Sequence, residues 1–379
     1  MTAIYHDIME LLSSRMVSKV DVMAPLYICS IGAHIFNGVN KTSRVLTEGA
    51  LIADSRIHVI MITVPGFGKS FMLKQFLEKE IGICWGTKIH PTWVASMTTA
   101  AFIGSIKMDK DGQPMVTRGI CERFKKSIVG IHEFAGITNS MALSYNVELN
   151  DALLLALDDG SVRKNVATGE IEFTTELTLF SAVQPARYNL TSGLGRRLCF
   201  LVYIPTLEDV ERLRKTRRRS RYVVDNKKLL NKIREEIDQK HEDIKKIQKI
   251  TFTDKLYDWL EKNKVIPYEE VLYERIGIGY AIMTQSIKDE LVVDLDDELE
   301  RIFIQQHQDR MSIKEGVDTQ QVWRFIREEK EILKETLYQT LMEFSLDRRS
   351  IHSRLRTLEV LGYIKDQGDK YLITHKEEI

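Results

Sequence analysis

The chain has 379 residues, of which 44% are hydrophobic, so it is long enough for two or three domains with buried cores. Its 54 lysines and arginines balance its 54 aspartates and glutamates, which excludes a polybasic binder and confines any nucleic-acid surface to part of the chain. Its four cysteines are far apart and include no C-x-x-C pair, which predicts neither a zinc site nor a disulfide framework.

These cysteines favour a reducing, cytoplasmic setting, in a prokaryotic-type cell or in the host of a virus. No apolar run approaches the roughly 20 residues that a membrane span needs. The N-terminus carries acidic residues among its apolar ones, which is not typical of a signal peptide. We therefore expect no membrane partner.

Residues 1–50 predict an N-terminal helical segment, in which Ile4, Ile8 and Leu11 share one face and Ala24–Phe36 is buried. From residue 51 to 206, short apolar runs alternate with helical stretches. Such alternation is typical of an α/β protein with a three-layer αβα core. The predicted strands are Ile57–Ile62, Ser127–Ile131, Leu177–Val183 and Phe200–Ile204.

The most specific motif is TVPGFGKS at Thr63–Ser70, between the first predicted strand and an amphipathic helix. This context is the one that a phosphate-binding loop needs, although Thr63 stands where the usual pattern has a glycine. Two glycines let the backbone curl around phosphates, and the helix N-terminus adds partial positive charge. The alternative is a glycine-rich turn that arose by chance. The expected ATP-contacting residues are Val64, Pro65, Gly66, Phe67, Gly68, Lys69, Ser70 and Phe71.

Within this loop, Lys69 is predicted to reach the β- and γ-phosphates and Ser70 to bind Mg²⁺. A hydrolase also needs a carboxylate at the end of a neighbouring strand to polarise water. Glu133 follows the apolar run Ser127–Ile131 and is the candidate, as catalytic residue and metal ligand. The alternative is an ordinary surface acid. His132 stands where the usual motif has an aspartate, so we expect weaker organisation of Mg²⁺, or help from Asp158 or Asp159.

Basic residues in three places predict nucleic-acid contacts. Arg163 and Lys164 lie in a predicted hairpin with its tip at Thr168-Gly169, and such a hairpin can grip a DNA backbone. Arg212–Arg221 opens a helical lid or linker at residues 207–315, and its alternative is a solvated helix face.

Residues 316–379 predict three helices and a two-stranded wing, the winged-helix pattern. Its third helix would begin after an N-cap at Asp347 and would carry basic residues toward DNA. The alternative is a protein-interaction module. The candidate DNA-binding residues there are Arg348, Arg349 and Arg354.

The order of motifs from residue 24 to 205 resembles the AAA+ ATPases, and among them the minichromosome-maintenance (MCM) helicases and their helix-2-insert relatives. Met97–Phe102 and Asp109–Pro114 lie where that branch carries its insert hairpin. Gly130–Phe134 resembles its I-D-E-F motif, and the segments that resemble its presensor hairpin, sensor strand and L-S-R-F motif are Asn150–Lys164, Leu179–Tyr188 and Leu194–Leu198.

The resemblance implies roles for several further residues. Gln184 replaces the sensor asparagine, and the implied arginine finger is Arg196, with Arg197 second. Arg275 is the candidate lid arginine, and Lys164 stands near the DNA-tracking lysine. An arginine finger acts on the ATP of a neighbouring subunit, so a homo-oligomer is implied, with a hexameric ring as the family expectation.

The resemblance implies an ATP-hydrolysing ring motor on DNA, a compact helicase or translocase without the family's N-terminal DNA-binding domain, of a mobile element or virus. The first alternative is an ATP-dependent DNA-binding switch, such as a replication initiator, a loader or a transposition partner. The second is a transcription activator or protein remodeller.

Overall fold

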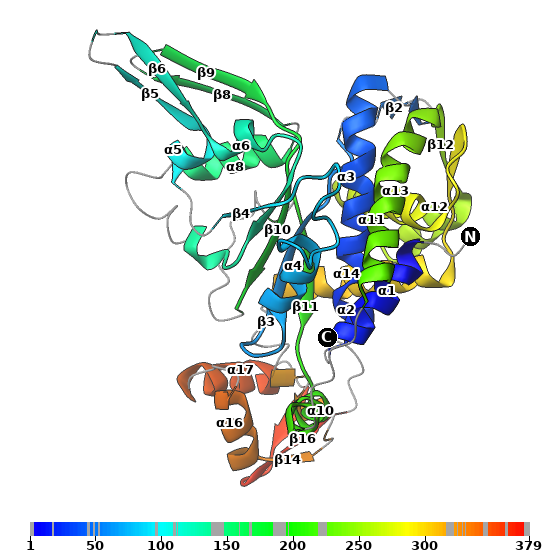
Figure 1. Cartoon of the computed structure of the whole chain (residues 1–379). Coiled ribbons are helices and arrows are strands. Elements are labelled where there is room, and N and C mark those ends of the chain that lie inside the picture. Colours follow the sequence, from blue (N-terminus) through cyan, green and yellow to red (C-terminus); the bar gives the residue numbers. More distant parts are fainter. Residues whose placement is uncertain are drawn as a thin grey trace.

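A five-stranded parallel sheet forms the centre of the protein and is flanked by helices (Figure 1). The computed structural model describes residues 4–16, 19–43, 46–47, 50–51, 54–94, 98–108, 111, 113–137, 148–158, 160–166, 169–184, 195, 197–218, 226–315, 322–323, 325–327, 329, 331–343, 348–360 and 363–374. In spatial order the strands are β11 (Leu198–Tyr203), β3 (His58–Thr63), β10 (Thr178–Val183), β7 (Ile128–Ile131) and β4 (Thr92–Val94). The predicted α/β class is confirmed.

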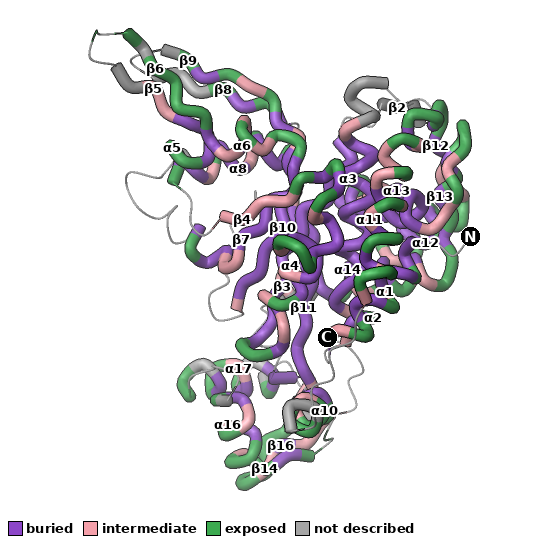
Figure 2. Tube along the Cα trace, viewed as in Figure 1, coloured by how far each residue is buried: buried purple, intermediate pink, exposed green. Residues whose placement is uncertain are grey.

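Every residue of β3, β7, β10 and β11 is buried (Figure 2). Parallel strands covered on both faces have nearly continuous apolar sequences, which is why these four were predictable as strands. The edge strand β4 was not predicted, because it is short and half-buried. All four cysteines, Cys29, Cys84, Cys121 and Cys199, are buried and free, as their spacing predicts.

Two antiparallel hairpins extend together from one side of the sheet (Figure 1). Strands β5 (Gly104–Met108) and β6 (Pro114–Arg118) form the first, at the position predicted for the insert. Strands β8 (Ser161–Val166) and β9 (Gly169–Thr174) form the second, as predicted. The two hairpins touch through β5 and β9. The nearby helices are α4 (Lys69–Leu77), α5 (Thr99–Phe102), α6 (Ile120–Arg123) and α8 (Glu148–Leu157).

The N-terminal segment packs against the segment that follows the sheet. Strand β1 (Leu46–Thr47) pairs in parallel with β12 (Lys249–Phe252), within the sheet order β13-β12-β1-β2. The strand β12 lies within residues 207–315, where the sequence predicted a helical lid or linker; that prediction was incomplete, because α11 ends at Asp243 and β12 follows it. The remaining elements are α1 (Ile4–Arg15), α2 (Val20–Met23), α3 (Pro25–Ser43), β2 (Ala50–Leu51), α10 (Leu207–Arg218), α11 (Lys227–Asp243), η3 (Ile244–Lys246), α12 (Asp254–Lys262), α13 (Pro267–Thr284), β13 (Glu290–Val293) and α14 (Asp297–Glu315).

The stretch Val20–Gly38 corrects the expectation that no apolar run is long enough to span a membrane, because its length and composition alone would allow it to do so. Within the protein, however, 89% of that window is buried. The helix α3, which overlaps it, packs along α13 and also contacts β3. Its apolar character is therefore accounted for by a core position.

The helices α3 and α13 cross at two glycines. A Cβ atom built on Gly279 would lie 1.9 Å from the carbonyl oxygen of Cys29, and one on Gly32 would lie 2.2 Å from the carbonyl oxygen of Gly279. We expect Gly279→Ala to lower the free energy of unfolding by about 1–3 kcal/mol, because backbone must move to admit the methyl group. Urea denaturation tests this. The control Gly277→Ala meets side chains and no backbone, with Val293 nearest at 2.6 Å, and should cost less; equal losses would contradict the expectation.

The C-terminal residues form a separate small unit with a three-stranded antiparallel sheet in the order β14-β16-β15. The two later helices and the two final strands predicted for this segment are present. Strand β14 was not predicted, and Asp347, the expected N-cap, lies outside the described residues. The elements are β14 (Glu331–Leu333), α16 (Lys334–Glu343), α17 (Arg348–Val360), β15 (Ile364–Asp366) and β16 (Lys370–Ile373).

One buried histidine should make the fold sensitive to acid. The Nδ1 atom of His58 accepts the backbone N–H of Leu179 at 3.1 Å, so Nε2 carries the proton and donates to the Leu157 carbonyl at 3.0 Å. Burial, and then the positive charge of Arg56, lower the pKa of His58 from 6.5 to about 3. Protonation would break the bond with Leu179.

Since the pKa of His58 is lower in the folded chain than in the unfolded one, unfolding takes up a proton between pH 6.5 and about 3. As the pH falls through that window, this group alone should lower the free energy of unfolding by about 1.4 kcal/mol per pH unit. Urea titrations at pH 7 and pH 5, on wild type and His58→Gln, measure this contribution. A pH dependence that the substitution leaves unchanged would contradict it.

Candidate functional site

The loop after β3 has the backbone conformation that a phosphate-binding loop needs. Gly66 and Gly68 have φ values of 87° and 88°, in the left-handed region where only glycine is unstrained. Gly68 is the N-cap of α4, so Lys69 and Ser70 begin the helix. Thr63, which replaces the usual first glycine, is the last residue of β3 and is fully buried. The threonine side chain therefore points into the core and not into the loop.

Lys69 and Glu133 meet across the intervening strand β10. Lys69 Nζ lies 2.7 Å from Glu133 Oε2, with the side chains 11% and 30% exposed. The backbone N–H of Phe134 donates to the Ala182 carbonyl of β10 at 2.8 Å, which fixes the turn that carries the acid. The other carboxylate oxygen, Glu133 Oε1, is buried and has no hydrogen-bond partner among the described residues.

Gln184 completes this cluster, since it directly follows β10. It is half-buried and lies at the carboxyl end of the strand between β3 and β7. Three motifs that are far apart in the sequence thus end at one edge of the sheet. In open α/β sheets this edge is where ligands bind.

The residues present fit Mg²⁺ bound together with phosphate. The Ser70 hydroxyl and the unpartnered Glu133 oxygen are hard oxygen donors, as Mg²⁺ prefers, and Mg²⁺ usually needs only one or two such protein ligands beside phosphates. Among the described residues, no group of three or more His, Cys, Asp or Glu side chains forms a metal site. The metal would therefore be held by a nucleotide as much as by the protein.

His132 stacks on Trp93 of β4, with ring centroids 4.2 Å apart and planes at 7°. Partial burial lowers the pKa of His132, and the charge of Lys74 lowers it further, against the opposing effect of Glu78. A neutral, stacked imidazole thus occupies the position where an aspartate would add negative charge. Sequence reasoning missed the stack, because Trp93 comes from an unpredicted strand.

A hollow of about 490 Å³ lies at the carboxyl end of β11, the strand next to β3. Its walls include Val22, Tyr203, Gln308 and Arg327. The Tyr203 ring lies 6.4 Å from the ring of Phe67, a residue of the loop itself. The hollow is large enough for a nucleobase and sugar next to bound phosphates. Sequence reasoning missed these residues because they come from four distant segments.

Phe71 of α4, the last of the residues expected to contact ATP, is 44% exposed.

Two of the predicted arginines, Arg197 and Arg275, lie at the opposite edge of the sheet. Arg197 immediately precedes β11, whose first residue pairs with His58, the first residue of β3. Arg197 forms an ion pair of 2.7 Å with Asp158. Arg275 Nη1 is 3.5 Å from the carbonyl oxygen of Arg56, which also precedes β3. Arg196 lies outside the described residues.

Strand β3 separates these groups from the loop by roughly 16 Å, from five steps of about 3.3 Å. Arg197 and Arg275 therefore do not contact a phosphate held by Lys69 of the same chain. The expectation that Arg275 lines the nucleotide site holds only if that site belongs to another subunit. Asp158 lies at this far edge too, and thus does not assist a metal at Ser70; Asp159 lies outside the described residues.

The predicted DNA-contacting residues lie on two separate surfaces. Arg163 is exposed on hairpin β8–β9 and forms an ion pair with Glu170 of the opposite strand. The backbone of Lys164 is in β8, but its side chain lies outside the described residues. Arg348 and Arg349 are exposed at the start of α17, and Arg348 lies 5.4 Å from the centre of the Tyr338 ring.

Arg354 is half-buried further along α17. The basic run at 212–221 begins in α10, where Arg212 pairs with Asp209 at 2.6 Å; residues 219–221 lie outside the described part.

No protein-family model matches the chain, and no curated protein matches it.

Proposed function

We propose that the chain is an ATP-hydrolysing AAA+ ring motor that acts on DNA, similar to the MCM-like helicases and translocases. One observation carries this proposal: Lys69, Glu133 and Gln184 converge at one edge of the sheet, while Arg197 and Arg275 lie at the other. An ATPase whose site is shared between subunits needs both halves, and each chain would supply one half to each neighbour.

In the proposed reaction the loop and Lys69 would hold the β- and γ-phosphates of ATP, and Ser70 would hold Mg²⁺, which would supply positive charge against the phosphates. Binding of phosphate to Lys69 releases Glu133 from its 2.7 Å ion pair. Glu133 then orients the attacking water and takes its proton, and the Gln184 amide contacts the γ-phosphate or this water. The hollow beside Phe67 receives the base.

The neighbouring subunit would complete the site. Arg196 or Arg197 would offset the charge that grows on the transferred phosphoryl group, and Arg275 would act from the same face. A head-to-tail contact of this kind closes into a ring when the rotation permits. Hexamer is the family expectation.

Support for DNA as the partner comes from the two hairpins and from α17. The paired hairpins project away from the sheet (Figure 1), as expected of elements that reach into a ring channel. Lys164 of β8 would grip the DNA backbone, and Arg348, Arg349 and Arg354 would contact DNA if the C-terminal unit is a winged helix. Arg163 is less suited to this role than the sequence suggests, because Glu170 neutralises it.

One observation favours the alternative of a slow switch, such as an initiator, loader or transposition partner. The neutral His132, stacked on Trp93, replaces a metal-organising acid. Slow hydrolysis suits a protein whose ATP drives assembly on DNA.

ATP turnover with and without single-stranded and forked DNA tests the proposal. If the chain is a motor, we expect DNA to stimulate turnover several-fold and Glu133→Gln to abolish it. We expect Lys164→Ala to uncouple ATP turnover from DNA unwinding. Turnover that ignores DNA, together with ATP-dependent assembly, would select the switch. No DNA affinity at low salt would leave the third candidate, a protein remodeller or transcription activator.

A further inference from the structure

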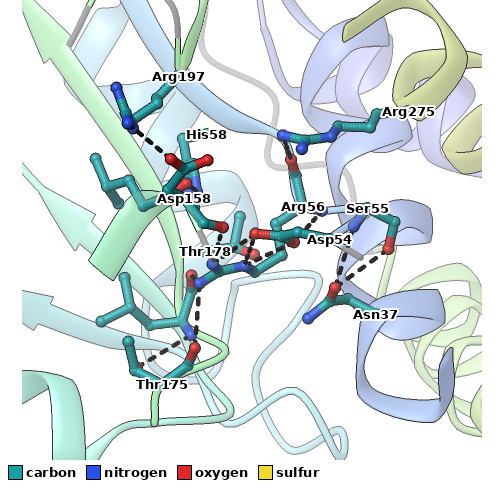
Figure 3. A network of polar contacts seen from close by, with 12 residues as sticks. Asn37, Asp54, Ser55, Arg56, His58, Asp158, Thr175, Thr178, Arg197 and Arg275 are labelled. Carbon is teal, nitrogen blue, oxygen red and sulfur yellow. Dashed lines mark hydrogen bonds and ion pairs between the residues drawn. The ribbon is translucent and has the colours of Figure 1, made fainter. Parts of the chain in front are cut away.

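A fully buried arginine lies at the edge of the sheet opposite the candidate phosphate-binding loop and binds several groups there. Arg56 is 0% exposed, and its Nε and Nη2 atoms donate to the carboxylate of Asp54 at 2.6–2.9 Å (Figure 3). Its other donors reach the carbonyl oxygens of Leu177 at 2.8 Å and Asp158 at 2.9 Å. Guanidinium geometry is needed here, because one group binds several acceptors in different directions.

These carbonyl groups lie at the two ends of hairpin β8–β9 where it joins the sheet, which we call its roots. Asp158 precedes β8, and Leu177 follows β9. The roots also touch each other, since the Thr175 N–H donates to the Gly160 carbonyl at 2.7 Å. Gly160 has a φ of 77°, and a Cβ atom there would lie 1.9 Å from the Thr175 carbonyl oxygen. The direction of the hairpin is thus fixed where it leaves the sheet.

The same network includes the arginines that face a neighbouring subunit in the proposed ring. Arg197 pairs with the side chain of Asp158, whose carbonyl group binds Arg56. Arg275 of α13 donates to the Arg56 carbonyl at 3.5 Å. If a neighbour's ATP displaced Arg197 or Arg275, the movement would therefore be transmitted to Arg56, which binds both ends of the hairpin (Figure 3).

Two groups, Asp54 and the neighbouring His58, keep their charge states near neutral pH. Burial raises the pKa of Asp54, but the attraction and hydrogen bonds of Arg56 outweigh it, and the net pKa is lowered. His58, the histidine next to the network, is neutral because burial and the positive charge of Arg56 lower its pKa to about 3. Movement, and not proton transfer, is the signal that such a network can transmit.

We propose that Arg56 is a positioning residue that couples the arginines acting on a neighbour's ATP to the orientation of hairpin β8–β9. This inference rests on the proposed function, since it takes nucleotide bound between subunits as the input. It differs from a purely structural role, in which Arg56 would stabilise the fold and leave the response of the hairpin to nucleotide unchanged.

Hydrogen exchange of the hairpin, with and without the slowly hydrolysed analogue ATPγS, tests the inference on the full chain. The variant Arg56→Lys keeps a cation beside Asp54 but loses the fork that binds both roots. We expect nucleotide affinity to stay within about twofold and the nucleotide-induced change in exchange at 160–178 to fall at least about fivefold. The matched control is Ser55→Ala, a buried neighbour whose hydroxyl binds Ala33 and Asn37 of α3.

The second variant, Gly160→Ala, disturbs the root and leaves the charged pair in place. It should lose the response in the same way, which covers the case that Arg56→Lys does not fold. A hairpin that does not respond in wild type, or that responds normally in the variants, would overturn the inference while nucleotide binding stands. Absence of nucleotide binding by wild type would overturn the proposed function and this inference with it.

Discussion

Under the proposed function, Lys69→Ala is expected to abolish ATP hydrolysis, with a fall of at least about 100-fold in turnover and a loss of measurable nucleotide affinity, because Lys69 would be the cation that stabilises charge on the phosphates. The Lys69 side chain is 11% exposed and at the start of α4, so no other lysine of the helix can replace it. Equilibrium binding of a fluorescent ATP analogue, together with phosphate release, measures both effects.

Two variants calibrate this experiment. Glu133→Gln should bind nucleotide like wild type and lose hydrolysis, since the amide keeps the shape but cannot accept the proton of water. Lys74→Ala removes a half-exposed lysine of the same helix, 3.9 Å from Glu78, and should change turnover less than about twofold. Full turnover by Lys69→Ala would place the reaction elsewhere in the chain.

Asp54→Ala is expected to lower the free energy of unfolding by about 3–5 kcal/mol, because it leaves Arg56 charged and buried without its counter-ion. Asp54 is 4% exposed and Arg56 0%, so water cannot replace the carboxylate. The double variant Asp54→Ala/Arg56→Met should recover part of the loss, since it removes the uncompensated charge. Chemical denaturation measures all three proteins.

An exposed ion pair provides the contrast for this prediction. Glu242 binds Lys88 and Lys245, and its side chain is 47% exposed. Glu242→Ala should therefore cost much less than Asp54→Ala. Equal losses for Asp54→Ala and Glu242→Ala would show that burial does not set the energy of the Asp54–Arg56 pair.

The central strands were predictable because β3, β7, β10 and β11 are buried over their whole length and read as continuous apolar runs. The strands that sequence reasoning missed are short, and distant pairing forms them. Thr92–Val94 is a strand because it pairs with β7, and Lys249–Phe252 because it pairs with β1 and β13. No local periodicity specifies such pairing.

The loop half of the candidate site was also predictable, because Gly66, Gly68 and Lys69 act through local backbone geometry. The position of Arg275 was not, because it depends on how α13 crosses α3 at Gly279. The role of Arg56 had no local signal either. An arginine before a strand is ordinarily a surface residue, and only the tertiary fold buries it.

Subunit mixing tests the central claim, an ATPase site shared between neighbouring chains, most directly. One variant carries Glu133→Gln, and the other carries Arg196→Ala together with Arg197→Ala; alone, each should be nearly inactive. Mixed in equal amounts, they should recover about one quarter of wild-type turnover, because random pairing in a head-to-tail ring leaves about one interface in four intact. A mixture as inactive as its parts, or an arginine variant that is fully active alone, would contradict the account.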